Sequence, residues 1–302
     1  FNLADFYVRR VKRLAPALFV MILLTLIAGH FILTPEHLKH LSMSAVASVL
    51  SLANFFFAFA TDTGYFADDS RTLPLLHLWS LGVEEQFYFL WPLVLAALLA
   101  RYRHLTVFWM ICGGVMLGLL LSEYVVRTDA NFAYYMLPSR AFQLLTGALL
   151  AFVPSSPGAR AKLSGNAAGS VGLALIAASL FFIDESWPFP GISAAPATFG
   201  AALVLFAGTR GGHVTQALSL APLRSIGVIS YSLYLWHWPI LAFLHYAYVD
   251  FTLTVKLAAF GAVLIVAAAS YRFVEQPGRH WKVSPRDALQ WLFIMPAIVI
   301  AI

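Results

Sequence analysis

Charged side chains are scarce in this sequence of 302 residues: they make up 11% of it, while hydrophobic side chains make up 61%. Soluble domains carry about 25% charged residues, so a water-soluble globular class is excluded. The mean hydropathy of +0.80 favours a protein embedded in lipid. The net charge of +5 comes from short basic clusters between apolar runs rather than from one basic face, which argues against a nucleic-acid partner.

Cysteine and the common catalytic motifs are also missing. Cys112 is the only cysteine and lies within an apolar run, which excludes an intrachain disulfide and a cysteine-cluster metal site. The chain has no GxSxG, HExxH, Walker or GxGxxG motif, so soluble-type hydrolases, zinc proteases, nucleotide hydrolases and dinucleotide enzymes lack their usual signatures. No metal site is expected.

Long hydrophobic runs are what the sequence has instead. Backbone polar groups in a bilayer must be satisfied within the segment that crosses it, so each run is expected to be helical. The predicted fold class is all-α, a polytopic transmembrane helical bundle. The ten runs are Leu14–Leu33, Leu41–Ala60, Gln86–Ala100, Leu105–Leu121, Leu137–Val153, Ala168–Ile183, Ala194–Ala207, Ile226–Leu244, Thr254–Tyr271 and Ala288–Ile302.

The positions of Lys and Arg predict how these runs cross the membrane, because short cytoplasmic loops carry an excess of both. If every run crossed, the Arg101–Arg103 turn would lie outside and the acidic loop of Asp62, Asp68 and Asp69 inside, opposite to this rule. If Leu41–Ala60 is instead re-entrant or interfacial, fourteen of the nineteen basic residues face the cytoplasm. The prediction is therefore about nine crossings plus one re-entrant or interfacial helix, with an external C-terminus.

A basic cluster precedes the first run. Arg9, Arg10, Lys12 and Arg13 stand within five residues of one another. Such a cluster is typical of a positive-inside anchor. Arg10 and Arg13 are also three residues apart on one face of a helix, where two guanidinium groups can bind a phosphorylated ligand. The residues alone leave both interpretations open.

Two polar stretches interrupt the apolar character of the chain. One places His77, Glu84 and Glu85 against the outer end of a span, and the other places Tyr231 and His237 within a span. Ionisable residues at such places are costly and tend to face cavities or functional sites. The alternatives are helix capping and headgroup contact for the two glutamates, interfacial packing for the tyrosine, and a packed, hydrogen-bonded histidine.

Residue chemistry alone leaves the function class open. Glu275 lies between Arg272 and Arg279, and is expected to hold helix ends together in an ion network rather than to take part in chemistry. A polar-lined helical bundle suits an enzyme, but it also suits a proton-coupled secondary transporter or acyl-carrier channel. A helical scaffold or sensor whose polar residues only bind a lipid is a third interpretation.

Four segments, taken in order, resemble the acyltransferase-3 family, specifically the bacterial polysaccharide and lipopolysaccharide O-acetylases. They are FYVRRVKRLAPAL, HLWSLGVEEQFYFLWP, RAFQLLTGALLA from Arg140 to Ala151, and ISYSLYLWHWP with YRFVEQPGR from Tyr271 to Arg279. The resemblance covers nearly the whole chain. It implies a multi-pass enzyme of the bacterial inner (cytoplasmic) membrane, which transfers an acyl group, expected to be acetyl, from cytoplasmic acyl-CoA to a hydroxyl of a cell-surface carbohydrate such as O-antigen or exopolysaccharide.

The resemblance also assigns roles to residues. Arg10 and Arg13 match the arginine pair thought to hold the phosphates of the acyl-CoA donor, and no bound cofactor is implied. The family's essential histidine lies on the first membrane helix, upstream of Phe1, so the chain alone is expected to be inactive. Gln143 stands where the family often has glutamate, which removes a charge beside Arg140. The other candidates are His77, Glu84, Glu85 and His237 for catalysis, and Trp79, Ser80, Tyr231 and Arg140 for the substrate path.

The family arrangement predicts domain boundaries as well. Residues 1–287 are expected to form the transmembrane acyltransferase domain without its first two helices. Residues 288–302 would begin a further transmembrane helix that leads to an external SGNH-type, esterase-like domain. Acyl-CoA, the carbohydrate acceptor and the lipid bilayer are the expected partners.

Overall fold

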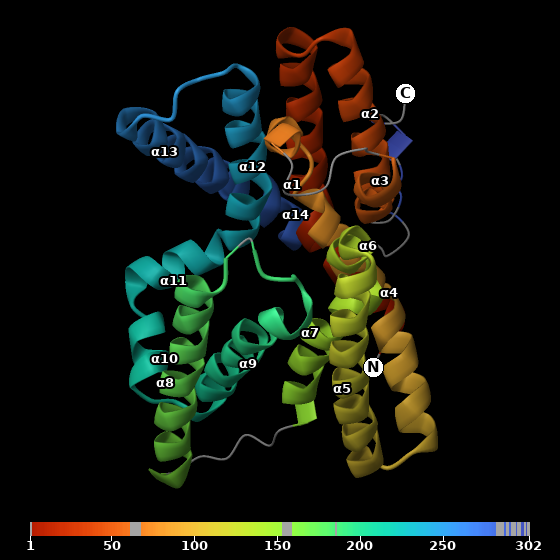
Figure 1. Cartoon of the computed structure of the whole chain (residues 1–302), viewed down its shortest axis with the longest axis vertical. Coiled ribbons are helices and arrows are strands. Elements are labelled where there is room, and N and C mark those ends of the chain that lie inside the picture. The colour runs from red at the N-terminus through yellow and green to blue at the C-terminus, as the bar shows by residue number, and fades with distance from the viewer. Residues whose placement is uncertain are drawn as a thin grey trace. The chain divides into compact units, whose positions relative to one another are not determined.

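The computed structural model describes residues 2–60, 68–152, 159–184 and 186–281, together with a few isolated positions after 281. These residues form helices joined by short turns, with no strand among them (Figure 1). The all-α class is therefore confirmed. The chain divides into two compact units, one made of Phe1–Gly82 with Ile226–Ile302 and the other of Val83–Ser225.

The first unit combines the two ends of the chain. Its helices begin at residues that cap them. The Asn2 side chain accepts a hydrogen bond from the Ala4 amide at 3.0 Å, and the Thr252 side chain caps the helix that begins at Leu253. The first helix packs against four others of this unit, α2, α12, η4 and α14. The elements are α1 (Leu3–Ile32), α2 (Pro35–Val49), α3 (Ala53–Phe59), the 3₁₀-helix η1 (Asp68–Thr72), α12 (Ser230–Tyr246), α13 (Leu253–Ser270), the π-helix η4 (Tyr271–Glu275) and α14 (Gln276–His280).

The second unit holds the middle of the chain. α8 and α9 pack closely because glycines face each other: a Cβ added to Gly172 would lie 2.7 Å from the carbonyl oxygen of Gly200. α5 packs along α7 and also contacts α6 and η3. The elements are α4 (Leu78–Arg101), which begins in the first unit, α5 (His104–Thr128), α6 (Ala130–Tyr135), α7 (Leu137–Leu149), η2 (Leu150–Phe152), α8 (Ala159–Phe182), η3 (Gly191–Ala194), α9 (Ala195–Arg210), α10 (His213–Leu218) and α11 (Ala221–Val228), which ends in the first unit.

Six helices in the described part of the chain are long and apolar enough to cross a membrane. The count rises to seven if α11 and α12, which are bent by 68° at a short break, form one span. These helices make the chain a multi-pass membrane protein, whereas the number of about nine crossings stays a prediction. The six are Leu3–Ile32, Leu78–Arg101, His104–Thr128, Gly165–Phe182, Gly191–Arg210 and Leu253–His280.

Two more of the expected spans are not single long helices. The run Leu41–Ala60 is broken into α2 and α3 around Ser51, whose φ of 58° lies in the left-handed region. This break agrees with the expectation that the run does not cross as one helix. Within the run Leu137–Val153, α7 has 13 residues. Its length of about 20 Å is short of the roughly 30 Å of hydrocarbon.

Two predicted boundaries are wrong. α1 begins at Leu3, so the basic cluster lies inside this helix rather than before it. α4 begins at Leu78 instead of Gln86, so the polar stretch with the two glutamates is helical. Arg, Lys, Glu and Gln are good helix formers, so a helix continues past the end of the apolar run. The acidic loop around Asp62 and most of Ala288–Ile302 lie outside the described residues.

Candidate functional site

Hydrogen bonds fasten the turn before α4 to α12. The Tyr234 hydroxyl donates to the carbonyl oxygen of His77, and its oxygen lies 2.8 Å from the Ser80 hydroxyl. Since the single phenolic proton is already used, Ser80 is the donor in the second bond. Trp238 donates from Nε1 to the carbonyl oxygen of Leu73 at 2.8 Å. Two segments that are far apart in the sequence thus meet in the first unit.

Two histidines lie against each other at this junction. The ring centroids of His77 and His237 are 5.6 Å apart, with the rings at 77° to each other. His237 Nδ1 is 2.7 Å from the carbonyl oxygen of Tyr234, so this nitrogen carries a proton. His77 is only 6% exposed, and neither of its ring nitrogens makes a hydrogen bond of ordinary geometry to a described residue. We call His77, Ser80, Tyr234 and His237 the histidine cluster.

The environment of His77 disfavours its protonated form. Burial and the facing His237 ring lower the pKa of His77 well below the usual value, and the nearby backbone carbonyl of Leu235 opposes this shift only in part. The imidazole is therefore neutral near pH 7. A neutral imidazole can accept a proton from a hydroxyl group, which an imidazolium cannot do.

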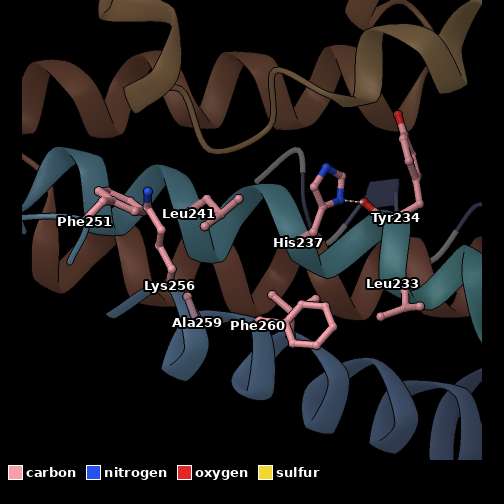
Figure 2. Close-up of a pocket in the computed structure, with 9 residues that line it drawn as sticks. Leu233, Tyr234, His237, Leu241, Phe251, Lys256, Ala259 and Phe260 are labelled. Atoms are coloured by element: carbon pink, nitrogen blue, oxygen red, sulfur yellow. Dashed lines mark hydrogen bonds between the residues drawn. The ribbon is translucent and has the colours of Figure 1, made fainter. Parts of the chain in front are cut away.

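A pocket of about 410 Å³ opens beside His237, between α12 and α13. Its volume falls in the range of roughly 300–1,000 Å³ that small-molecule sites occupy. Figure 2 shows Phe251 and Lys256 at one end, Leu233 toward the other, and His237 between them on α12. Most of the lining is apolar. The lining residues are Leu233, Tyr234, His237, Leu241, Phe251, Lys256, Ala259, Phe260 and Val263.

The predicted donor-binding arginines lie in the N-terminal part of α1. Arg10 is half-buried and Arg13 is exposed. One turn beyond Arg10, the carbonyl oxygen of Leu14 accepts a hydrogen bond from the Tyr231 hydroxyl at 2.9 Å. Tyr231, which was predicted to line the substrate path, therefore ties α12 to α1 next to the arginine pair.

A buried carboxylate supports the same part of α1. Glu275 is fully buried, accepts a hydrogen bond from the Ser232 hydroxyl at 2.9 Å and forms an ion pair with Arg279. Gly278 packs directly on α1, because a Cβ at this position would lie 2.7 Å from Pro16 Cγ. The expected ion network thus forms with Arg279. The turn that carries it is a π-helix, a form found often at functional sites.

Arg140 is packed between aromatic rings in the second unit. Its guanidinium carbon lies 4.7 Å from the Tyr134 ring centroid and 5.0 Å from that of Phe189, and Nε donates to the carbonyl oxygen of Tyr134 at 2.9 Å. The side chain is 8% exposed. Gln143, where the family often has an acid, is half-buried one turn later. Cation–π and hydrogen-bond contacts therefore stabilise the buried charge.

The remaining predicted residues lie at the start of α4. Trp79 is 8% exposed, Glu85 is half-buried and Glu84 is exposed. The two glutamates and Arg140 belong to the second unit, while the histidine cluster, Arg10, Arg13 and Tyr231 belong to the first.

Two residues that shape the site were not predicted. Tyr234 joins the cluster and Lys256 lines the pocket. The signal for Tyr234 was its spacing of three from His237, which puts both side chains on one helical face. A single lysine within an apolar run was the signal for Lys256.

Comparison with known proteins decides the family. Residues 1–272 match the model of the acyltransferase domain of the acyltransferase-3 family. The chain belongs to this family. The match confirms the resemblance carried by the four sequence segments. No solved structure matches the chain.

Curated relatives agree with this assignment to the acyltransferase-3 family. Peptidoglycan O-acetyltransferase OatA of Listeria monocytogenes is 34% identical over 295 residues, which cover 92% of this chain and 46% of that protein. O-acetyltransferase OatA of Staphylococcus aureus strain NCTC 8325 is 32% identical over 291 residues, covering 92% and 48%. A putative O-acetyltransferase of S. aureus strain COL is 31% identical over 324 residues, covering 100% and 52%. The chain thus spans about half the length of these relatives.

Proposed function

We propose that this chain is the membrane part of an O-acyltransferase that moves an acetyl group from acyl-CoA to a carbohydrate hydroxyl. Membership of the acyltransferase-3 family supports the reaction class. The observation that carries the proposal is the histidine cluster, in which the buried imidazole of His77 meets the imidazole of His237 beside a pocket. Such groups suit a path along which a hydroxyl loses its proton.

The donor is proposed to bind at the N-terminal part of α1. Arg10 and Arg13 supply two guanidinium groups three residues apart, which suit the phosphates of CoA. Tyr231 ties α12 to this stretch of α1, and Gly278 packs α14 against Pro16 of the same helix. These contacts limit the motion of α1, so the two arginines are presented on a supported helix.

The chemistry exchanges a thioester for an ester. The C–S bond of the acyl-CoA breaks, a C–O bond to the carbohydrate forms, and the hydroxyl proton passes through a base to the departing CoA sulfur. We propose that this base is the histidine which the family resemblance implies is essential. His77, Ser80, Glu84, Glu85, Tyr231 and His237 are proposed to line the path.

The acceptor is proposed to be a glycan of the bacterial envelope. The names of the relatives add peptidoglycan to the O-antigen and exopolysaccharide expected from the sequence. The predicted orientation places the basic end of α1 at the cytoplasmic side of the inner membrane, where acyl-CoA is made, and the acceptor on the other side. An external SGNH-type domain beyond the last helix belongs to this proposal.

The two arginines give the sharpest test of donor binding. Charge-assisted contacts contribute about 1.5–3 kcal/mol each, so Arg10→Ala or Arg13→Ala should raise the KM for acetyl-CoA by roughly ten- to a hundredfold. Steady-state acetyl transfer by the full-length protein in detergent measures this. Arg9→Ala removes an exposed charge from the same cluster and is the matched control. An unchanged KM in a folded double variant contradicts the assignment.

A transporter or acyl-carrier channel gains no support from the three relatives described above, which are named as acetyltransferases. Proton-coupled transport would move a solute without changing its covalent structure. Purified full-length protein in vesicles distinguishes the two: release of free CoA with a labelled glycan product supports the transferase, and solute uptake without product supports the transporter.

A further inference from the structure

The Lys256 side chain has no acidic partner among the residues that the structure describes. Only two of the ten apolar runs contain a basic residue, namely Arg140 and Lys256. Aromatic rings and a backbone carbonyl accommodate Arg140, as described above. Lys256 is exposed in the first turns of α13, and its side chain makes no ion pair or hydrogen bond within the part of the chain that the structure describes. An ionisable residue at the edge of a span without a partner in the protein points to a ligand of opposite charge.

An apolar groove begins at this lysine. It follows α12 from Leu241 back to Leu233, eight residues or about 12 Å of helix at 1.5 Å per residue. On α13, Phe260 (Figure 2) and Val263 also line the pocket. The His237 ring lies between the two ends of the groove. The pocket therefore has one cationic end and a long hydrophobic body.

We propose that this groove binds one anionic phospholipid, with the headgroup phosphate at Lys256 and one acyl chain along Leu241 and Phe260 to the His237 ring. A free phosphate ion would leave the apolar walls in water, and a zwitterionic lipid would place a second positive charge near the lysine. Only an anionic lipid uses both features. The bound chain covers the open side of the pocket and shields His237 from water. This site depends on neither the acyl donor nor the acceptor.

Thermal stability in defined lipid tests the charge. Full-length protein in a neutral maltoside detergent should gain a higher Tm on addition of dioleoyl phosphatidylglycerol than on addition of dioleoyl phosphatidylcholine, because a ligand that binds the folded state stabilises it. Lys256→Ala should weaken the apparent affinity for phosphatidylglycerol about fivefold, the factor that corresponds to roughly 1 kcal/mol per lysine near an anionic headgroup. Lys39→Ala, which removes an exposed lysine of α2, should keep the full response.

Position-specific crosslinking tests the groove. A benzophenone side chain in place of Phe260, which lines the pocket, should capture phosphatidylglycerol in nanodiscs. The same side chain in place of Leu257, an exposed residue of α13 outside the lining, should capture several-fold less of it. Equal capture at both positions, an equal response to the two lipids, or an undiminished response in Lys256→Ala overturns the proposal.

Discussion

At the scale of single residues, Glu275 has a fully buried carboxylate. A charge removed from water is costly unless an opposite charge and hydrogen bonds compensate for it. Arg279 supplies the charge and the Ser232 hydroxyl supplies a hydrogen bond at 2.9 Å. The three residues come from α12, η4 and α14, so compensation of one carboxylate links three elements.

Loss of Arg279 should therefore destabilise the first unit. Removing one partner of a buried ion pair costs about 3–5 kcal/mol, and the expected cost here is lower, about 2–3 kcal/mol, because the Arg279 side chain is 31% exposed and partly screened. The Tm of Arg279→Ala in detergent should fall clearly, whereas Arg272→Ala, an exposed arginine of η4, should leave it unchanged. Equal Tm values for the two variants would show that Glu275 needs no ion pair.

At the scale of elements, α14 can lie on α1 only because Gly278 has no side chain. Gly278→Ala would place a Cβ 2.7 Å from Pro16 Cγ, so the two helices must separate. Overpacking of this kind costs about 1–3 kcal/mol. The Tm should fall, and the KM for acetyl-CoA should rise if the α1 arginines bind the donor.

Gly261→Ala is the matched control for this change. Gly261 lies in α13 with nothing within 4 Å of its added Cβ. Alanine favours a helix over glycine by up to about 1 kcal/mol, so this variant should keep or slightly raise the Tm. A loss of stability equal to that of Gly278→Ala would mean that glycine flexibility, rather than close packing, matters in both helices.

The sequence predicted elements well where a long apolar run stood alone. Leu14–Leu33, Leu105–Leu121 and Thr254–Tyr271 each lie largely within one long helix. The break at Ser51 was not visible, because its left-handed backbone occurs without a glycine or proline to signal it. The 68° bend between α11 and α12 was also missed.

The candidate site was predictable in its residue types but not in its contacts. The motifs singled out His77 and His237 as unusual in apolar surroundings, and the structure brings their rings together. Nothing in either segment indicates that the Tyr234 hydroxyl bonds to the turn before α4, because such pairing depends on how distant helices pack. The same holds for Tyr231 and the carbonyl of Leu14.

At the scale of the whole molecule, the family, the all-α class and the multi-pass character are as the sequence predicted. The predicted number of crossings rests on the distribution of Lys and Arg among the loops. The described helices include six or seven candidate spans, fewer than the predicted number of about nine. The difference concerns the run Leu137–Val153, where α7 is short, and the run Ala288–Ile302, most of which lies outside the described residues. The orientation of the loops decides whether the Lys and Arg distribution predicts the topology correctly.

Cysteine labelling of intact cells and inverted vesicles checks that topology. In a Cys112→Ser background, which removes the only native thiol, Asp68→Cys should react with a membrane-impermeant maleimide from the outside and Arg103→Cys only from the cytoplasmic side. The reason is that Arg101 and Arg103 form a basic turn that the positive-inside rule keeps in the cytoplasm. Asp250→Cys is a control for the outer face. If Asp68→Cys instead reacts from the cytoplasmic side and Arg103→Cys from the outside, the predicted topology is wrong, as expected if Leu41–Ala60 crosses the bilayer. Reaction of both from the same side would mean that α4, which lies between them, does not cross.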